Sequence, residues 1–263
     1  MTRYAHPEVT AVVLAAGHGT RMNSDLAKVL HPMAGQPLLA RVLEALERLG
    51  VGRVLVVVGH QRERVRAAFA DREIEWVVQD PQRGTGHAVM MAAPALEDFR
   101  GTLLVVCGDT PLLRASTLHA LLAGHAASRA AITVLSMRLP DPAGYGRILR
   151  KGRLEIEVPG PIEGIVEHRD ATPEQRAIDE VNSGIYAFSY PELSTVLAQL
   201  TAHNAQGEYY LTDTVTLLGR AGRTTAVVCA PDHRELLGIN TVDQLAEAER
   251  IHRELAGGGE GRG

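Results

Sequence analysis

Short apolar runs alternate with amphipathic segments through the first half of the chain, and this alternation restricts the possible folds more than any other feature. Five runs rich in β-branched residues are bounded by turn residues, as buried parallel strands are: 9–14, 53–58, 74–78, 102–107 and 132–137. Helical periodicity occupies the segments 37–49, 62–70, 87–96 and 116–127. This order predicts an α/β fold with a Rossmann-like, doubly wound, mostly parallel sheet and helices on both of its faces.

The pattern changes after Pro140, where the pieces become shorter and richer in glycine and proline. Candidate strands there span 144–149, 154–158, 164–168 and 181–188. They predict a small antiparallel, β-rich subregion added to the parallel half.

Two capping-box patterns mark helix starts, Thr172 with Gln175 and Thr241 with Gln244, and the second opens a final helix through Leu255. We therefore expect one domain over residues 1–256. It comprises a first half (1–139), a β-rich part (140–240) and a C-terminal helix (241–256), and a disordered glycine-rich tail follows (257–263).

Length and composition exclude several classes of protein. The 263 residues carry a net charge of -4 and 45% are hydrophobic, as in ordinary soluble proteins. The longest apolar runs are about five residues, far below the roughly 20 that cross a bilayer, so we expect no membrane span. The run 11–16 is too short for a signal peptide. Mild acidity and few aromatic residues (one Trp, six Tyr and three Phe) argue against nucleic acid as a partner.

Both cysteines, Cys107 and Cys229, end apolar runs and are expected to be reduced residues of the core. Reduced thiols are typical of a reducing compartment, so we expect a cytoplasmic protein.

The loop after the first strand is the first candidate site, because ligands of such sheets bind outside the carboxyl ends of the strands. It reads Leu14-Ala15-Ala16-Gly17-His18-Gly19-Thr20-Arg21-Met22. Its two glycines allow backbone N–H groups to face an anion, and Arg21 can hold two phosphate oxygens in its fork. The loop lacks the third glycine of a dinucleotide site and the Gly-Lys of a P-loop. A plain strand-to-helix turn remains the alternative.

Lys28 is a second candidate because lysine is rare in this chain. Only two of the 27 basic residues are lysines. A lysine supplies a compact positive charge for a phosphate, and the alternative is a solvated surface side chain.

Asp109 follows the fourth strand directly, next to Gly108, which permits close approach of a ligand. Mg²⁺ takes one or two protein oxygens and fills the rest of its octahedron with phosphate and water. A single aspartate at this edge therefore suits a Mg²⁺ ion that arrives with a nucleotide. Helix capping by Asp109 is the alternative.

Amide and carboxylate side chains end several other strands. Gln79 precedes Gly84 in the loop after the third strand, where its amide can read a uracil or thymine edge; plain turn chemistry is the alternative. Glu167 and Asn182 can bind sugar hydroxyls. Asn240 offers a carbonyl oxygen to a metal, or simply caps the following helix. We find no covalent nucleophile.

Together these segments resemble the uridylyltransferase domain of the bacterial bifunctional N-acetylglucosamine-1-phosphate uridylyltransferase and glucosamine-1-phosphate acetyltransferase. The opening loop fits many nucleotidyltransferases, whereas Lys-Val-Leu-His (28–31) and Asn-Ala-Gln-Gly-Glu-Tyr-Tyr (204–210) are more specific. The resemblance also covers Gly-Thr-Gly-His (84–87), Gly-Asp (108–109), Gly-Tyr-Gly-Arg-Ile (144–148) and Gly-Ile-Val-Glu-His (164–168), so it extends over nearly the whole chain in order.

The resemblance implies a nucleotide-diphospho-sugar transferase fold and a role for each candidate. Residues 1–139 would be the nucleotide-binding half and residues 140–240 the sugar-binding part. The implied nucleotide-binding residues are Leu14, Ala15, Ala16, Gly17, Gln79, Gly84 and Thr85. Arg21, Lys28 and Asp109 would be catalytic, Asp109 and Asn240 would bind Mg²⁺, and Gly146, Glu167 and Asn182 would contact the sugar.

The implied reaction joins UTP and N-acetylglucosamine 1-phosphate into UDP-N-acetylglucosamine, with release of pyrophosphate and no enzyme intermediate. Two alternatives remain: a uridylyl- or thymidylyltransferase for another hexose 1-phosphate, and a non-catalytic sugar-nucleotide sensor. Cys107 stands where the family often has an aromatic residue, and residues 155–161 look like an inserted surface hairpin.

The family's acetyltransferase half is a β-helix that forms trimers, and nothing after Leu255 could form it. We therefore expect a monomer or a weak oligomer. The chain is either a standalone enzyme or the front half of a longer one.

Overall fold

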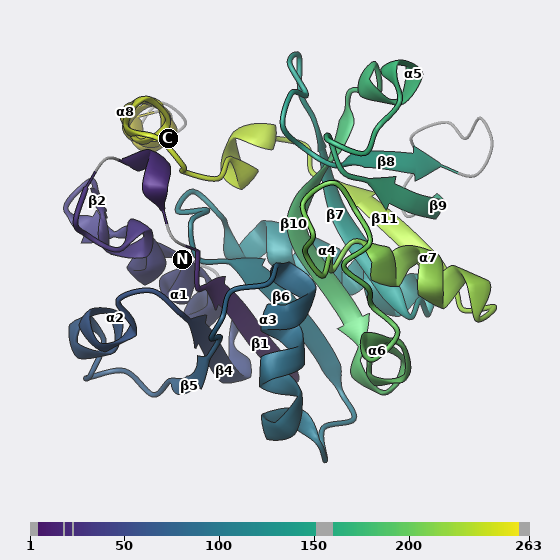
Figure 1. Ribbon diagram of the computed structural model, residues 1–263. Helices are drawn as coiled ribbons and strands as arrows, with labels where there is room; N and C mark the ends of the chain where they lie inside the picture. Colours follow the sequence, from purple (N-terminus) through teal and green to yellow (C-terminus); the bar gives the residue numbers. More distant parts are fainter. Residues whose placement is uncertain (1–4, 18, 23, 151–159, 258–263) are drawn as a thin grey trace, which may run out of the picture.

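A nine-stranded mixed sheet forms the centre of the molecule (Figure 1). The computed structural model describes residues 5–17, 19–22, 24–150 and 160–257. Across the sheet the strands are β5 (Glu75–Val78), β4 (Val51–Val58), β1 (His6–Ala15), β6 (Thr102–Cys107), β10 (Glu180–Ser189), β7 (Ile132–Arg138), β11 (Thr225–Cys229), β9 (Gly160–Val166) and β8 (Arg147–Arg150). A separate pair, β2 (Pro32–Met33) and β3 (Gln36–Pro37), lies beside it.

Helices cover both faces of the sheet, because its strands are buried on both sides. One core cluster joins the sheet to α1 (Leu38–Leu49), α2 (Arg62–Ala68) and α4 (Ala115–Ser128). The other joins it to α3 (Thr85–Ala92), α6 (Tyr190–Leu197) and α7 (Asp213–Arg220). Short 3-10 turns occur at Thr20–Met22, Lys28–Leu30, Ala93–Leu96 and His233–Leu236, and α5 (Pro173–Arg176) is a single turn.

The C-terminal helix α8 (Val242–Gly257) packs away from both main clusters. Its buried residues Ala248 and Ile251 contact Met22, Leu112 and Ile239 in a third, smaller cluster. The helix thus supports the segments that carry Arg21 and Asn240. No helix in the described part of the chain is long and apolar enough to span a membrane.

The five strands predicted in the first half are confirmed, and β5, β4, β1 and β6 form a continuous parallel block. Since parallel strands end at one edge, the loops after β1, β5 and β6 meet there. The predicted helices are confirmed as well, although the segment 87–96 begins earlier, at Thr85, and ends in a 3-10 turn.

The expected division into a parallel half and an added antiparallel subregion is wrong. Strand β10 lies in the middle of the sheet and pairs antiparallel with both β6 and β7. Strand β7 therefore belongs to the far side of the sheet, where it pairs in parallel with β11. Every residue of β10 except Gly184 and Ser189 is buried, as in a central strand.

Several second-half elements differ from the sequence expectation. β8, β9 and β10 confirm three of the candidate strands, whereas the candidate strand 154–158 and most of the expected hairpin 155–161 lie outside the described residues. β11, α6 and α7 were not predicted; they are short elements of five, eight and eight residues. The Thr172 capping box is present in full.

One buried histidine makes the fold sensitive to acid. His125 on α4 is 6% exposed, and its Nδ1 lies 2.9 Å from the Thr133 hydroxyl. Burial lowers the pKa of His125 from 6.5 to about 4. As pH falls below 6.5 the unfolded chain takes up a proton that the folded protein does not. Stability present above that pH is therefore lost progressively as pH falls toward 4.

Replacing this histidine should make the free energy of unfolding depend less steeply on pH below pH 6.5. His125→Gln keeps a polar partner for Thr133 but does not titrate. Between pH 7 and pH 4.5, we expect its free energy of unfolding to fall by about 2 kcal/mol less than that of the parent, measured by urea denaturation. His203→Gln, at an exposed histidine, is the matched control. Parallel curves for the parent and His125→Gln would contradict this assignment.

Candidate functional site

A cavity of about 350 Å³ lies at the carboxyl edge of the parallel block. The turn after β1, the loop after β5 and the end of β6 form its walls. Its lining is Leu14, Ala15, Ala16, Gly17, Lys28, Val29, Gln79, Gln82, Gly84, Thr85, Ala88, Cys107, Asp109 and Glu208. All seven predicted nucleotide-binding residues are among them, together with Lys28 and Asp109.

The loop after β5 is held in place by its own side chains and by a neighbouring loop. Gln79 is 4% exposed and donates from Nε2 to the Gly84 carbonyl at 2.9 Å. Gly84 has φ +100, and a Cβ there would lie 2.7 Å from the carbonyl oxygen of Tyr209. Only glycine therefore fits this turn, and its narrow backbone leaves the adjacent cavity open.

Lys28, Asp109 and Asn240 meet at one end of the cavity, although they lie far apart in the sequence. The Lys28 ammonium donates to the Asp109 carboxylate and also, over 3.2 Å, to Asn240 Oδ1. Arg21 donates to the same amide oxygen at 3.1 Å. The Lys28 and Asp109 side chains are only 13% and 17% exposed. Two oxygen ligands thus converge on one positive charge.

These contacts decide between the alternatives that the sequence left open. Lys28 is not a solvated surface lysine. The Asp109 carboxylate binds an ammonium rather than a helix end. Asn240 does not cap α8 with its side chain, because Thr241 accepts from the Gln244 N–H and Gln244 in turn accepts from the Asn240 N–H.

The three predicted sugar residues form a second group beside this cavity, outside its lining. The Asn182 N–H donates to the Gly146 carbonyl at 2.8 Å. A Cβ at Gly146 would lie 3.3 Å from Glu167 Oε2. Gly146 directly precedes β8, Glu167 directly follows β9 and Asn182 lies near the start of β10; these three strands lie close together in Figure 1.

Burial favours the protonated forms of Glu167 and of the neighbouring Tyr186. It raises the pKa of Glu167, and the negative charges of Asp170, Asp213 and Glu208 act in the same direction, whereas a hydrogen bond from Thr212 opposes the shift. Burial also raises the pKa of Tyr186 well above its usual value, so its hydroxyl stays protonated and accepts from Asn182 Nδ2 at 2.7 Å.

Cys107 connects the two groups and is more than a core residue. It lines the cavity, and its thiol donates to the Gly184 carbonyl at 3.4 Å. Burial raises the pKa of Cys107 to about 12, so the thiol stays neutral. Both cysteines are free, as expected, but each is only partly buried.

The segment 204–213 is the main element whose role the sequence left unexplained. Tyr209 exchanges backbone hydrogen bonds of 2.8 Å with Arg83 and Gly86 in the loop after β5. The Thr212 hydroxyl donates to Glu167 Oε1 at 3.1 Å. The segment therefore ties the cavity wall to the group around Glu167, and it contributes Glu208 to the lining.

Gln82 and Glu208 were both missed as lining residues. Gln82 donates to the Ala16 carbonyl at 3.2 Å and so ties the loop after β5 to the turn after β1. Its place two residues before Gly84 was the available signal. For Glu208 the signal was its position inside the specific motif 204–210.

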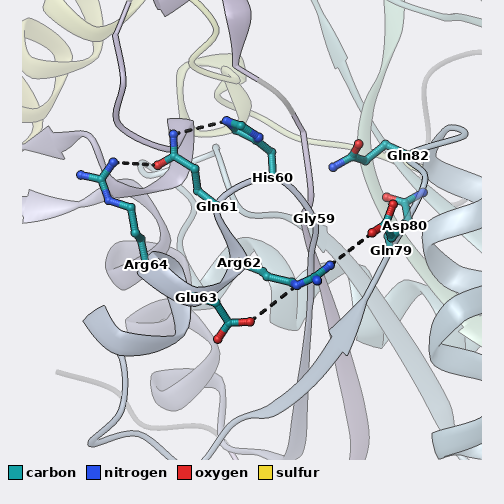
Figure 2. A pocket seen from close by; sticks show the side chains of 9 residues that line it. All are labelled: Gly59, His60, Gln61, Arg62, Glu63, Arg64, Gln79, Asp80 and Gln82. Atoms are coloured by element: carbon teal, nitrogen blue, oxygen red, sulfur yellow. Dashed lines mark hydrogen bonds and ion pairs between the residues drawn. The ribbon is translucent and has the colours of Figure 1, made fainter.

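A second hollow, of about 370 Å³, adjoins the cavity through Gln79 and Gln82 (Figure 2). Its charges are matched internally. Arg62 is paired with Asp80 at 3.3 Å and with Glu63 at 3.5 Å, and Arg64 donates to Gln61 Oε1 at 3.1 Å. This balance leaves little excess charge to attract an ion.

Comparison with known proteins places this geometry in a family. The profile of the MobA-like NTP transferase domain matches residues 11–167, which contain the turn after β1, Lys28, the loop after β5 and Asp109. The chain belongs to the MobA-like NTP transferase domain family. In open α/β sheets ligands bind outside the carboxyl ends of the strands, which is where the cavity lies.

Curated relatives of this NTP transferase domain are similar over most of the chain. The bifunctional protein GlmU of Thermobifida fusca is 50% identical over 247 residues, covering 91% of this chain and 50% of the relative. That of Geobacter metallireducens is 46% identical over 254 residues, covering 94% and 52%. The chain thus spans about half the length of these relatives.

Among solved structures, UDP-glucose pyrophosphorylase with UDP-glucose superimposes with a TM-score of 0.75 at 17% identity, covering 94% of this chain and 98% of the other. The same enzyme in its apo form gives a TM-score of 0.73 at 16% identity. At this identity the likeness establishes a shared mixed α/β fold.

Gly84→Ala should lower the free energy of unfolding by more than the backbone strain of a positive φ explains. Gly84→Ala adds a positive-φ penalty of about 1–3 kcal/mol and also a clash with the Tyr209 carbonyl. At Gly144, φ is +83 and nothing lies within 4 Å of a new Cβ, so Gly144→Ala is the matched control. In urea denaturation we expect Gly84→Ala to lose at least about 1 kcal/mol more than Gly144→Ala. Equal losses of unfolding free energy in the two variants would show that the Tyr209 carbonyl moves aside at no cost.

Proposed function

We propose that this chain is a nucleotidyltransferase that joins UTP and N-acetylglucosamine 1-phosphate to form UDP-N-acetylglucosamine and pyrophosphate. The observation that carries the proposal is the convergence of Lys28, Asp109 and Asn240 at one end of the cavity lined by residues 14–17, Gln79 and Gly84. Family membership and the motif resemblance support the choice of nucleotide and sugar.

The enclosed part of the cavity suits the uridine. Residues 14–17 and the loop around Gly84 line this part, and the small residues at 15–17 and 84 leave room for a base and a ribose. The Gln79 side chain is fixed by its bond to the Gly84 carbonyl, so an amide is held in place for reading the edge of a pyrimidine.

The charged end suits a triphosphate with a divalent ion. Asp109 and Asn240 offer hard oxygen ligands that already share one cation, the Lys28 ammonium, so these two residues fit Mg²⁺. In the described part of the chain, no group of three or more acidic, histidine or cysteine side chains is placed to hold a metal ion. Phosphate and water would complete the coordination. Bound there, the ion would neutralise charge on the phosphates.

The chemistry needs no covalent enzyme intermediate. An oxygen of the sugar 1-phosphate attacks the α-phosphorus of UTP, a new P–O bond forms, and the bond to the bridging oxygen breaks as pyrophosphate leaves. Arg21 and Lys28 stabilise the negative charge that spreads over the phosphoryl oxygens, and the chain's other contribution is to align the two substrates.

The group formed by Gly146, Glu167 and Asn182 is the proposed sugar site. The absence of a side chain at Gly146 leaves one face of the Glu167 carboxyl open. The carboxyl can accept from sugar hydroxyls, and the protonated Tyr186 hydroxyl reinforces the position of Asn182. Cys107 lies between this group and the nucleotide cavity, where the two substrates must meet.

Pyrophosphate release from a matrix of substrates tests the proposal. UTP and dTTP are each combined with the 1-phosphates of N-acetylglucosamine, glucose and galactose in the presence of Mg²⁺. The proposal expects the highest kcat/KM for UTP with N-acetylglucosamine 1-phosphate. Preference for another pair would favour a transferase of different specificity, and nucleotide binding without turnover would favour a sensor.

Two substitutions at the charged end should separate catalysis from folding. Asp109→Asn removes the carboxylate proposed for the metal and should abolish Mg²⁺-dependent turnover. Lys28→Ala should lower kcat by roughly 10²- to 10³-fold, the usual loss for one preorganised transition-state donor.

Asp98→Asn and Arg220→Ala are the controls for these substitutions, because both side chains are exposed and lie outside the cavity lining. They should retain the parent rate. Near-parent rates in Asp109→Asn or Lys28→Ala would overturn the assignment of the site.

A further inference from the structure

A third cavity, of about 380 Å³, lies between α1, α8 and the segment that follows Asp109. It shares no lining residue with the nucleotide cavity. Its lining is Arg41, Glu44, Ala45, Arg48, Pro111, Leu112, Leu113, Arg114, Ala115, His252 and Leu255. Nothing in the proposed reaction uses these residues.

Positive charge exceeds negative charge on these walls. Three arginines and one histidine line the cavity, and Glu44 is the single carboxylate among the lining residues. Arg114 has its own partner outside the lining, Glu235, at 3.2 Å. The charges that remain are Arg41 and Arg48 against Glu44, with His252 beside them.

Arg41, Arg48 and His252 have few charged or hydrogen-bonding partners in the protein. Arg48 approaches Glu44 only at 3.8 Å, which is too long for a hydrogen bond. Arg41 donates to the backbone carbonyls of Met33 at 2.9 Å and Ala34 at 3.3 Å, which fix its position. These neutral carbonyls do not compensate its charge. Within the described part of the chain, no hydrogen bond or ion pair satisfies His252.

Mutual repulsion reflects this imbalance. Burial lowers the pKa of Arg41, and although Glu44 opposes the shift, the charge of Arg48 adds to it. Burial and the charge of Arg41 also lower the pKa of His252. An anion placed between Arg41 and Arg48 would relieve their repulsion, and the neutral His252 ring could donate an N–H to it.

The rest of the wall is apolar. Pro111, Leu112, Leu113, Ala45 and Leu255 supply it. Ligand sites typically combine such walls with a few convergent polar groups in cavities of roughly 300–1,000 Å³. The Arg48 fork, the Arg41 Nη1 group, which does not bond the Met33 and Ala34 carbonyls, and an imidazole N–H are suited to the oxygens of a phosphate.

We propose that this cavity between α1 and α8 binds a small organic phosphate, with its phosphate on Arg41, Arg48 and His252 and its apolar body against Pro111–Leu113. Because Pro111 follows Asp109 by two residues, an occupant would contact the segment that carries the catalytic carboxylate. The site is independent of the proposed reaction, since neither its residues nor its ligand belong to that reaction.

Isothermal titration calorimetry with phenyl phosphate, in buffer free of nucleotide, phosphate and divalent metal, tests the site. Arg48→Glu should weaken binding by roughly 10-fold or more, as expected for losing a charged hydrogen-bond donor. Arg220→Glu is the matched control, because it changes the net charge equally at an exposed arginine outside the cavity. Benzoate, which carries one charge on a similar body, should bind at least about 10-fold more weakly than phenyl phosphate.

Lys28→Ala separates this site from the nucleotide cavity. Phenyl phosphate binding should be unchanged in Lys28→Ala and in Arg220→Glu. Four results would overturn the proposal: no binding to the parent protein, undiminished binding to Arg48→Glu, loss of binding in Lys28→Ala, or equal affinity for benzoate. Thermal melting checks that each variant is folded, and Arg48→Gln replaces Arg48→Glu if the latter is not.

Discussion

The ion pair between the Lys28 ammonium and the Asp109 carboxylate is the contact on which the rest of the site depends. It joins the segment after β1 to the end of β6, and through Asn240 it also reaches the start of α8. Each of these groups alone would be a partly buried charge or amide, which costs free energy unless it is paired. The third core cluster makes the pairing possible, because Leu112 and Ile239 pack together beside these segments.

The central position of β10 places the proposed nucleotide and sugar sites on one sheet. On one side it pairs with β6, which ends two residues before Asp109, and on the other with β7. Its register is irregular between Asn182 and Ile185, where Gly184 accepts from Cys107 through its carbonyl and donates to the Asn182 side chain. Asn182, in the group around Glu167, is therefore on the strand next to β6, so its separation from the cavity is fixed by strand spacing rather than by a flexible connection.

Sequence reasoning located the parallel block and its loops because apolar runs and turn residues are local signals. Asp109 and Gln79 were found for the same reason, each lying just beyond a strand, whereas Lys28 was found because lysine is rare in this chain. The insertion of β10 was not found, since strand order depends on long-range pairing that no local pattern encodes. Glu208 was missed because its place in the cavity depends on backbone hydrogen bonds between two loops over 120 residues apart.

The scarcity of lysine acquires a physical meaning in this setting. A lysine ammonium has three donors on a flexible stem and can satisfy oxygens in different directions, as Lys28 does with Asp109 and Asn240. An arginine would present a planar fork suited to one carboxylate or phosphate at a time. Arg21 has that role at the rim, where its exposed guanidinium contacts Asn240 and remains open to solvent. The two cations therefore differ in their contacts: Lys28 joins the Asp109 carboxylate to the Asn240 amide, whereas Arg21 contacts Asn240 and stays open to solvent.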